Sequence, residues 1–172
     1  MLPYPVFNMA GEPSAQPPPR GLARFLMRAP IWLYRLGLGW LLGKRFLLLT
    51  HTGRKTGRPR QNVLEVVRHD RPTGVYIVAS GWGEKSQWFR NIQKTPEVAI
   101  QVGSRRTEAV AVRLSPAEGQ RELLDYSRRY PFAFRAITRR MLGQAVPATE
   151  QECLRLAQWV PLMALRTKQR KL

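Results

Sequence analysis

Short runs of β-branched and aliphatic residues, each about as long as a strand, make up much of this chain. Closely spaced turns separate them. The turn that ends at Gly74 and the Gly103-Ser104 turn each predict a hairpin. A sheet of this length with open edges would pair with other chains, which favours closure into a small antiparallel barrel. The six predicted strands are residues 46–50, 62–68, 75–80, 98–102, 107–114 and 160–167.

Capping signals predict the helices. Ser115 is followed by a proline and then, at the third helical position, by Glu118, which predicts a helix over residues 116–129. The same pattern beginning at Thr149 opens a second helix towards Trp159. These helices flank the barrel, so the expected fold class is α+β, mainly β.

The N-terminal segments are of a different kind. Residues 1–19 hold six prolines and few core-forming side chains, so we expect a disordered arm followed by one domain over residues 20–172. Residues 22–42 predict a basic amphipathic helix, which either packs on the domain or lies on a membrane surface. A membrane span is not expected, because three basic residues interrupt the apolar stretch 31–50, at a cost of roughly 2.5–3.5 kcal/mol each.

The charge restricts the possible partners. The formal net charge is +18, so the surface must attract anions: nucleic acid, anionic lipid or a phosphorylated small molecule. Cys153 is the only cysteine, which excludes an intrachain disulfide and a cysteine-based zinc site and suits a reducing cytoplasmic setting. Two histidines, far apart in sequence, do not suggest a metal site, and no signal peptide is expected.

The turn at residues 50–60, THTGRKTGRPR, combines the features of an anion site. Gly53 and Gly57 permit a backbone whose N–H groups point inward together, and the surrounding basic and threonine side chains add donors. Its glycine spacing differs from that of a Walker loop. The alternative is a solvated, inert hairpin turn.

A second stretch, residues 79–91, follows a strand and turns into a helix that begins near Lys85 or Ser86. The helix N-terminus would face an anion or a ring carbonyl. Trp88 and Phe89 either flank a planar ligand or pack in the core.

Together, the runs LLLTHTGRKTGRPRQNVLEVV and YIVASGWGEKSQWFRNIQKTPEVAIQVG closely resemble the deazaflavin-dependent nitroreductase family, whose coenzyme is F420. The resemblance covers roughly residues 31–166, and Thr95 stands where the family usually has Asn. It implies a split antiparallel barrel of the FMN-binding type, with F420 in a groove, its phosphate and oligoglutamate tail on the basic turn, and FMN a less favoured ligand. The implied coenzyme contacts are Arg54, Lys55 and Thr56 for the tail, Arg60, Gln61, Asn62 and Val63 along the groove, and Val78, Ala79, Ser80, Gly81, Gln87, Trp88, Phe89 and Asn91 around the ring.

The resemblance also implies hydride transfer from reduced deazaflavin to an electron-poor acceptor: a quinone, a nitroaromatic or a conjugated alkene. Tyr130 is the candidate proton donor, with Ser80 a weaker one. The family often carries a YPxY pattern here, whereas this chain reads Tyr130-Pro-Phe-Ala-Phe, which argues against nitroimidazole-type reduction.

Two other functions remain open: a coenzyme carrier without efficient turnover, and a nucleic-acid or membrane-surface binder. We rank the nucleic-acid or membrane-surface binder lowest, because the basic residues of this chain are scattered and form no stripe. No nucleic-acid partner is therefore expected. The expected location is the cytoplasm, at the inner membrane face if residues 22–42 touch lipid. Relatives of this barrel commonly dimerise, so a homodimer is to be tested.

Overall fold

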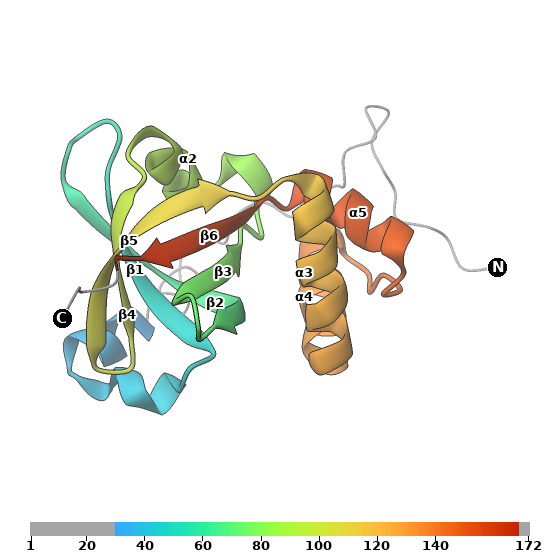
Figure 1. Ribbon diagram of the computed structural model, residues 1–172, viewed down its shortest axis with the longest axis horizontal. Coiled ribbons are helices and arrows are strands. Elements are labelled where there is room, and N and C mark those ends of the chain that lie inside the picture. Colours follow the sequence, from blue (N-terminus) through green and yellow to red (C-terminus); the bar gives the residue numbers. More distant parts are fainter. Residues whose placement is uncertain (1–29, 169–172) are drawn as a thin grey trace.

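A closed six-stranded antiparallel barrel forms the body of the molecule in the computed structural model, which describes residues 30–168 apart from the side chains of residues 140 and 141 (Figure 1). Around the barrel the strand order is β1-β2-β3-β6-β5-β4, with every neighbouring pair antiparallel. The strands are β1 (Phe46–Thr52), β2 (Pro59–Asp70), β3 (Val75–Ala79), β4 (Glu97–Val102), β5 (Arg105–Arg113) and β6 (Leu162–Thr167). The predicted barrel, its six strands and both hairpins are therefore confirmed.

The barrel interior is apolar and is closed at one end by helix α2 (Gln87–Lys94), which follows the short 3-10 turn η2 (Gly83–Lys85). Alternate residues of β1, such as Leu47 and Leu49, meet Trp88, Phe89 and Ile92 of α2 in one buried cluster. Phe89 is fully buried. The apolar face of α2 therefore closes one end of the barrel core.

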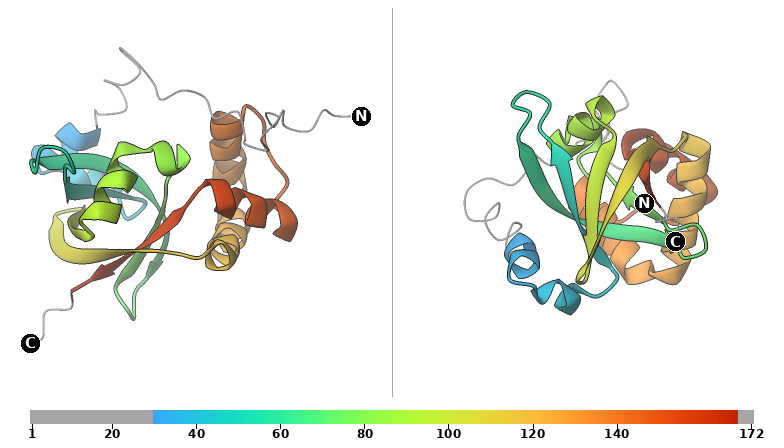
Figure 2. Two further views of the ribbon diagram at one scale, coloured as in Figure 1. Left: turned by 90° about the horizontal axis from the view of Figure 1, so that it is seen from above. Right: turned by 60° about the vertical axis from the view of Figure 1, so that its left-hand side comes forward.

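A helical layer covers one side of the barrel (Figure 2). It consists of α3 (Pro116–Arg129), α4 (Pro131–Leu142) and α5 (Glu150–Trp159), whose apolar residues share a second buried cluster with β2, β3 and β6. The capping box at Ser115 forms as predicted, and the Thr149 side chain accepts the Glu152 N–H at the start of α5. Helix α4 corresponds to no helix predicted from the sequence.

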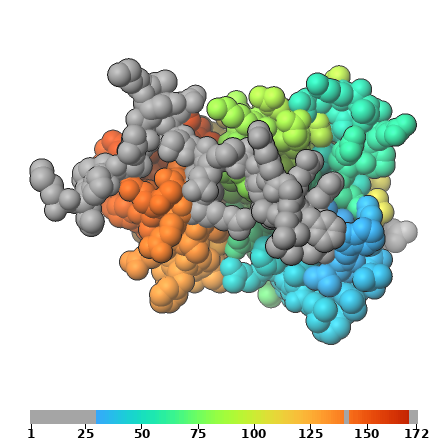
Figure 3. Space-filling view, turned by 180° about the vertical axis from the view of Figure 1, so that it is seen from behind, coloured from blue at the N-terminus to red at the C-terminus, as the bar shows by residue number. Residues whose placement is uncertain are grey.

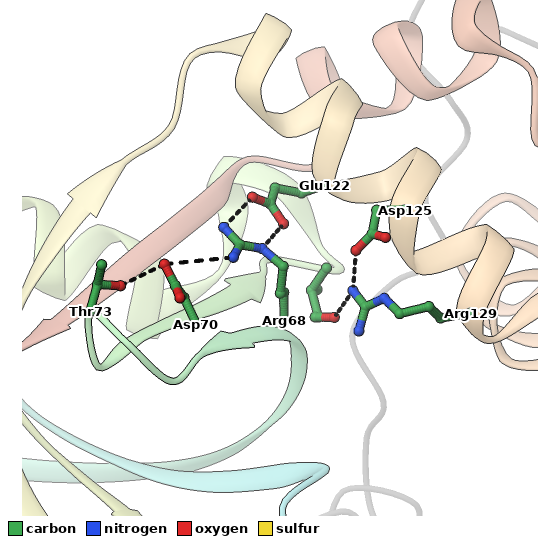
Figure 4. Close-up of polar contacts among 7 residues, drawn as sticks. Arg68, Asp70, Thr73, Glu122, Asp125 and Arg129 are labelled. Atoms are coloured by element: carbon green, nitrogen blue, oxygen red, sulfur yellow. Dashed lines mark hydrogen bonds and ion pairs between the residues drawn. The ribbon is translucent and has the colours of Figure 1, made fainter.

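An ion pair and a hydrogen bond hold α3 against β2 (Figure 4). The Arg68 guanidinium donates to both carboxylate oxygens of Glu122, at 2.7 and 2.8 Å, and Arg129 donates to the Val67 carbonyl oxygen at 3.1 Å. The first pair is bidentate and partly buried, a geometry in which an ion pair contributes to stability.

The N-terminal part of the described chain departs from the prediction. Residues 30–35 are helical, but Gly37 then adopts a left-handed φ of 75° and a separate 3-10 turn, η1 (Leu38–Leu42), follows. A continuous helix over residues 22–42 is therefore wrong in its second half, because the glycine conformation ends it. The predicted arm, residues 1–19, and residues 22–29 lie outside the described residues.

This segment packs on the outer face of β1 through Ile31 and Tyr34, which contact Leu48. The Tyr34 hydroxyl donates to the Phe46 carbonyl oxygen at 2.9 Å. On the face drawn in Figure 3, residues from 30 onwards (blue) lie at the opposite end from helices α4 and α5 (orange). No helix among residues 30–168 has the length and apolar character needed to cross a membrane.

Candidate functional site

The loop Gly53–Arg58 between β1 and β2 is closed by its own backbone. The Gly53 N–H donates to the Arg58 carbonyl oxygen at 2.8 Å, and the N–H groups of Thr56 and Gly57 donate to the Gly53 carbonyl oxygen at 3.1 and 2.8 Å. A side chain at position 53 would place its Cβ 3.0 Å from Thr56 Oγ1, so the loop needs glycine there. The prediction that these N–H groups point together at an anion is wrong, because the loop uses them itself.

Side chains are instead the donors that this loop presents. Lys55, Thr56, Arg58 and Arg60 are exposed. No ion pair within the described part of the chain includes any of these three cations. Three positive charges beside one hydroxyl therefore face solvent without a counter-charge from residues 30–168.

Arg54 differs from the neighbouring loop residues because hydrogen bonds attach it to helix α2. Asn91 Oδ1 accepts from the Arg54 backbone N–H at 3.2 Å and from its guanidinium at 3.0 Å. The Asn91 amide also lies 3.2 Å from His51 Nδ1, and His51 Nε2 lies 3.1 Å from Asn62 Oδ1. Since Asn91 is only 6% exposed and its amide is already bonded, it supports the loop; the predicted direct contact with a ligand stays a prediction.

The alternation of β2 divides the predicted groove residues between two faces of the sheet. Asn62, opposite Leu49, shares the interior face with His51, as does Arg60, whereas Gln61 and Val63 share the outer face with Thr50. Gln61 accepts a hydrogen bond from Arg35 at 3.2 Å. Gln61 and Val63 therefore share an outer surface, on which Val63 packs against the cluster of Ile31, Tyr34 and Leu48, while Arg60 and Asn62 reach this surface only near the loop.

Burial also restricts the predicted ring contacts. Val78, Ser80 and Phe89 are fully buried and Trp88 is 5% exposed, so the four side chains lie in the protein interior. The Ser80 hydroxyl donates to the Gly83 carbonyl oxygen at 2.7 Å. This bond and the burial argue against Ser80 as a proton donor. Ala79, Gly81 and Gln87 are the accessible members of the set.

Tyr130 lies between α3 and α4 and is 37% exposed. The guanidinium groups of Arg45 and Arg129 lie 5.2 and 5.5 Å from its ring centre. The neighbouring Tyr126 hydroxyl donates to Glu65 at 2.7 Å, and burial, followed by this hydrogen bond, raises the pKa of Tyr126.

The pairing of β1 with β2 fixes where these tyrosines lie. Glu65 pairs with Phe46 at one end of the β1–β2 ribbon, whereas Pro59 pairs with Thr52 beside the loop. Tyr126 and Tyr130 are therefore about 20 Å from the cationic loop along the strand.

A family model for F420H(2)-dependent quinone reductases matches residues 27–152 of this chain. The chain belongs to this family. F420H2 is the reductant and a quinone the acceptor in the family's activity, which confirms the deazaflavin-dependent reductase predicted from the sequence.

Two of the similar proteins are also named as F420H2-dependent reductases. A Mycobacterium tuberculosis protein named "Putative F420H(2)-dependent quinone reductase Rv3178" is 36% identical over 87 residues, which are 51% of this chain and 73% of the relative. Among solved structures, an F420-H2-dependent reductase, FDR-A, has a TM-score of 0.50 at 19% identity over 72% of this chain and 95% of its own. HutZ, the heme storage protein of Vibrio cholerae, also has a TM-score of 0.50, at 14% identity over 84% and 92% of the chains. The structural neighbours confirm the fold.

The residues of this reductase fit a polyanionic coenzyme. The three exposed cations of the loop region suit a phosphate and a carboxylate tail. The Ser86 hydroxyl, at the N-cap of α2, is buried without a hydrogen-bond partner among the described residues. The helix N-terminus that Ser86 caps suits a ring carbonyl, whereas the hydroxyl itself is closed to solvent.

Sequence reasoning missed several residues of the reductase site. His51 was considered only as a metal ligand, and no group of three metal-binding side chains occurs in the part of the chain that the structure describes. Arg45 and Glu65 were not singled out, because their contacts with Tyr130 and Tyr126 depend on the docking of α3. The alternation of β1 places His51 with Leu49 inside the barrel, and this local signal could have found it.

Proposed function

We propose that this reductase holds the phosphate and oligoglutamate tail of F420 on the loop Gly53–Arg58 and extends the coenzyme along the outer face of β2. The observation that carries this proposal is the set of unpaired cations Lys55, Arg58 and Arg60 at one end of that face. From there the strand leads through Gln61 and Glu65 towards the tyrosines, past Val63, which packs against Ile31 and Tyr34. The path joins an anion site to a candidate proton donor.

The ring would lie between these ends, near Ala79, Gly81 and Gln87, with the N-terminus of α2 facing a ring carbonyl. The buried Val78, Trp88 and Phe89 of the predicted set would support this surface from within. When bound, the reduced deazaflavin supplies a hydride.

A quinone that receives a hydride becomes a hydroquinone anion and needs one proton. We assign its delivery to the Tyr130 hydroxyl, which solvent can then reprotonate because the side chain is 37% exposed. Arg45 and Arg129, which flank the ring, would stabilise the negative charge left on the tyrosine oxygen.

A fluorescence titration with F420, and in parallel with FMN, tests the binding proposal. We expect saturable binding of F420, weakened by salt, and weaker binding of FMN, which lacks the oligoglutamate tail. Absence of F420 binding would refute both the reductase and the carrier. Binding without menadione-dependent oxidation of F420H2 above the protein-free rate would favour the carrier.

A second proposal concerns residues 30–45 and an anionic membrane surface. Trp32, Leu36, Trp40 and Leu41 are 54%, 69%, 63% and 55% exposed, and basic residues accompany them in this segment. Exposed aromatic and aliphatic side chains beside cations suit the lipid interface, where lipid-soluble quinones reside. Co-sedimentation with phosphatidylglycerol vesicles should exceed that with phosphatidylcholine vesicles and fall on Trp40→Ser; equal sedimentation would contradict the proposal.

The last proposals concern the oligomeric state, the domain bounds and the cellular location of the protein. A solved structure described as a domain-swapped dimer has a TM-score of 0.52 at 18% identity over 85% of this chain and 100% of that one. We propose a homodimer, with light scattering giving twice the chain mass of 19.8 kDa. We also propose one domain over residues 20–172, which limited proteolysis should leave intact, and a cytoplasmic location, which cell fractionation would test.

A further inference from the structure

His51 is a buried histidine that the proposed chemistry does not use. It lies on β1 directly before the cationic loop, is 3% exposed and faces the barrel interior. Both ring nitrogens have side-chain amide partners, Asn91 on α2 and Asn62 on β2. The ring therefore ties together the three elements that surround the loop.

The hydrogen bonds around Asn91 determine which atoms carry protons. Asn91 Oδ1 receives two donors from Arg54, so its NH2 group is the part that faces His51. His51 Nδ1 must then accept, which places the ring proton on Nε2, where it is donated to Asn62 Oδ1. The hydrogen bonds that link Arg54, Asn91, His51 and Asn62 all form only when His51 is neutral.

We propose that His51 is a positioning residue for the coenzyme's anionic tail: neutral His51 orients Asn91, and Asn91 holds Arg54 towards the loop's ligand. This inference rests on the proposed function of the loop. A proton added to Nδ1 would point an N–H at the Asn91 NH2 group, and turning the amide to relieve that clash would aim its NH2 group at the donors of Arg54. Protonation of His51 therefore releases Arg54.

The surroundings favour the neutral ring. Burial lowers the pKa of His51, hydrogen bonds with Asn62 and with the Thr52 backbone oppose this, and the nearby Arg60 charge lowers the pKa again. Other charged groups near the ring are Arg54 on the loop, Lys94 on α2 beside Arg54, Glu97 on β4, Glu108 on β5 and Lys168 after β6. Histidine is the side chain whose charge ordinarily changes between pH 5 and 8.

Two effects of acid then oppose each other, which makes the proposal testable. A protonated His51 adds positive charge near the bound anion, and that effect alone would tighten binding as the pH falls. Release of Arg54 would instead weaken binding. Because Arg54 supplies a charged contact, we expect the dissociation constant for F420 to rise between pH 8 and pH 5.5. The rise should stay below the roughly tenfold that a histidine with its ordinary pKa would give, because burial lowers the pKa of His51.

Substitutions at position 51 distinguish the hydrogen-bond relay from His51 through Asn91 to Arg54 from a general loss of structure at low pH. An Asn at position 51 carries an amide oxygen near the place of Nδ1 and does not titrate, so His51→Asn should bind normally at pH 8 and keep that affinity at pH 5.5. The amide of a Gln reaches only the place of Nε2 and leaves Asn91 without its partner, so His51→Gln should bind F420 weakly at both pH values. His69, stacked on Tyr76 at 3.9 Å, is the other histidine, and His69→Asn should keep the wild-type pH dependence.

A measurement without coenzyme separates this inference from the proposed function. In ¹⁵N NMR of the free protein, His51 should show the Nε2–H tautomer, and the Arg54 amide should lose its exchange protection as His51 titrates. Nδ1 protonated at pH 8, or an Arg54 amide indifferent to that titration, would overturn the relay even if F420 binds. Tighter binding of F420 in acid would overturn it as well. Failure of F420 to bind, with the expected NMR result, would refute only the proposed function.

Discussion

Lys55 offers a direct measure of how the loop binds its ligand. Its side chain is exposed and forms no ion pair within the described residues, so Lys55→Ala removes a charge without removing a contact that holds the fold. Two unit charges about 4 Å apart attract by about 1 kcal/mol in water and about 4 kcal/mol at an effective dielectric constant near 20. An exposed lysine belongs near the lower figure, so we expect the dissociation constant for F420 to rise about fivefold.

Fluorescence titrations of F420 at low and at high salt would measure this effect. The difference between wild type and Lys55→Ala should shrink as salt screens the charge, while kcat at saturating coenzyme stays unchanged. Arg106→Ala is the matched control, because it removes one positive charge at the start of β5, near the other end of the barrel from the loop. Equal weakening by both variants would show that only net charge matters and would refute a site at the loop.

Three other substitutions test the core, the α3 interface and the proton donor. Phe89→Ala should lower the free energy of unfolding by about 3–5 kcal/mol in urea titrations, since the ring is fully buried; a loss under about 1 kcal/mol would contradict this. Glu122→Ala should cost about 1–3 kcal/mol by removing the bidentate partner of Arg68, which keeps only its 3.9 Å ion pair with Asp70. The exposed pair of Lys168 with Glu108 provides a control, with Lys168→Ala costing less than about 1 kcal/mol. Tyr130→Phe should lower kcat for menadione about a hundredfold with an unchanged dissociation constant for F420, and equal kcat values would remove Tyr130 as donor.

The fold was predictable because its signals are local. Short β-branched runs, tight turns and the capping box at Ser115 each act within a few residues, and all recur in the structure. Helix α4 was missed because its N-cap is Tyr130, which gives no side-chain capping bond. The N-terminal helix was drawn too long because one glycine, Gly37, takes a left-handed conformation that composition alone does not reveal.

The candidate site was predictable only in part. The cationic loop was visible because its charges and glycines are adjacent in sequence. The link from Arg54 to Asn91 joins residues 37 apart, and it exists only because α2 closes the end of the barrel. The packing partner of α2 was also not predictable. Periodicity shows that a helix has an apolar face but does not show what that face packs against. Burial then placed Trp88 and Phe89 in the core.

Anaerobic mixing of the protein with F420H2 and menadione tests the central claim most directly. Recovery of the absorbance of oxidised F420 should be faster than in the protein-free mixture, should saturate with F420H2, and should need higher F420H2 concentrations with Lys55→Ala while reaching the same maximal rate. Oxidation at the protein-free rate, under conditions where F420 binding is saturated, would contradict a hydride-transferring reductase.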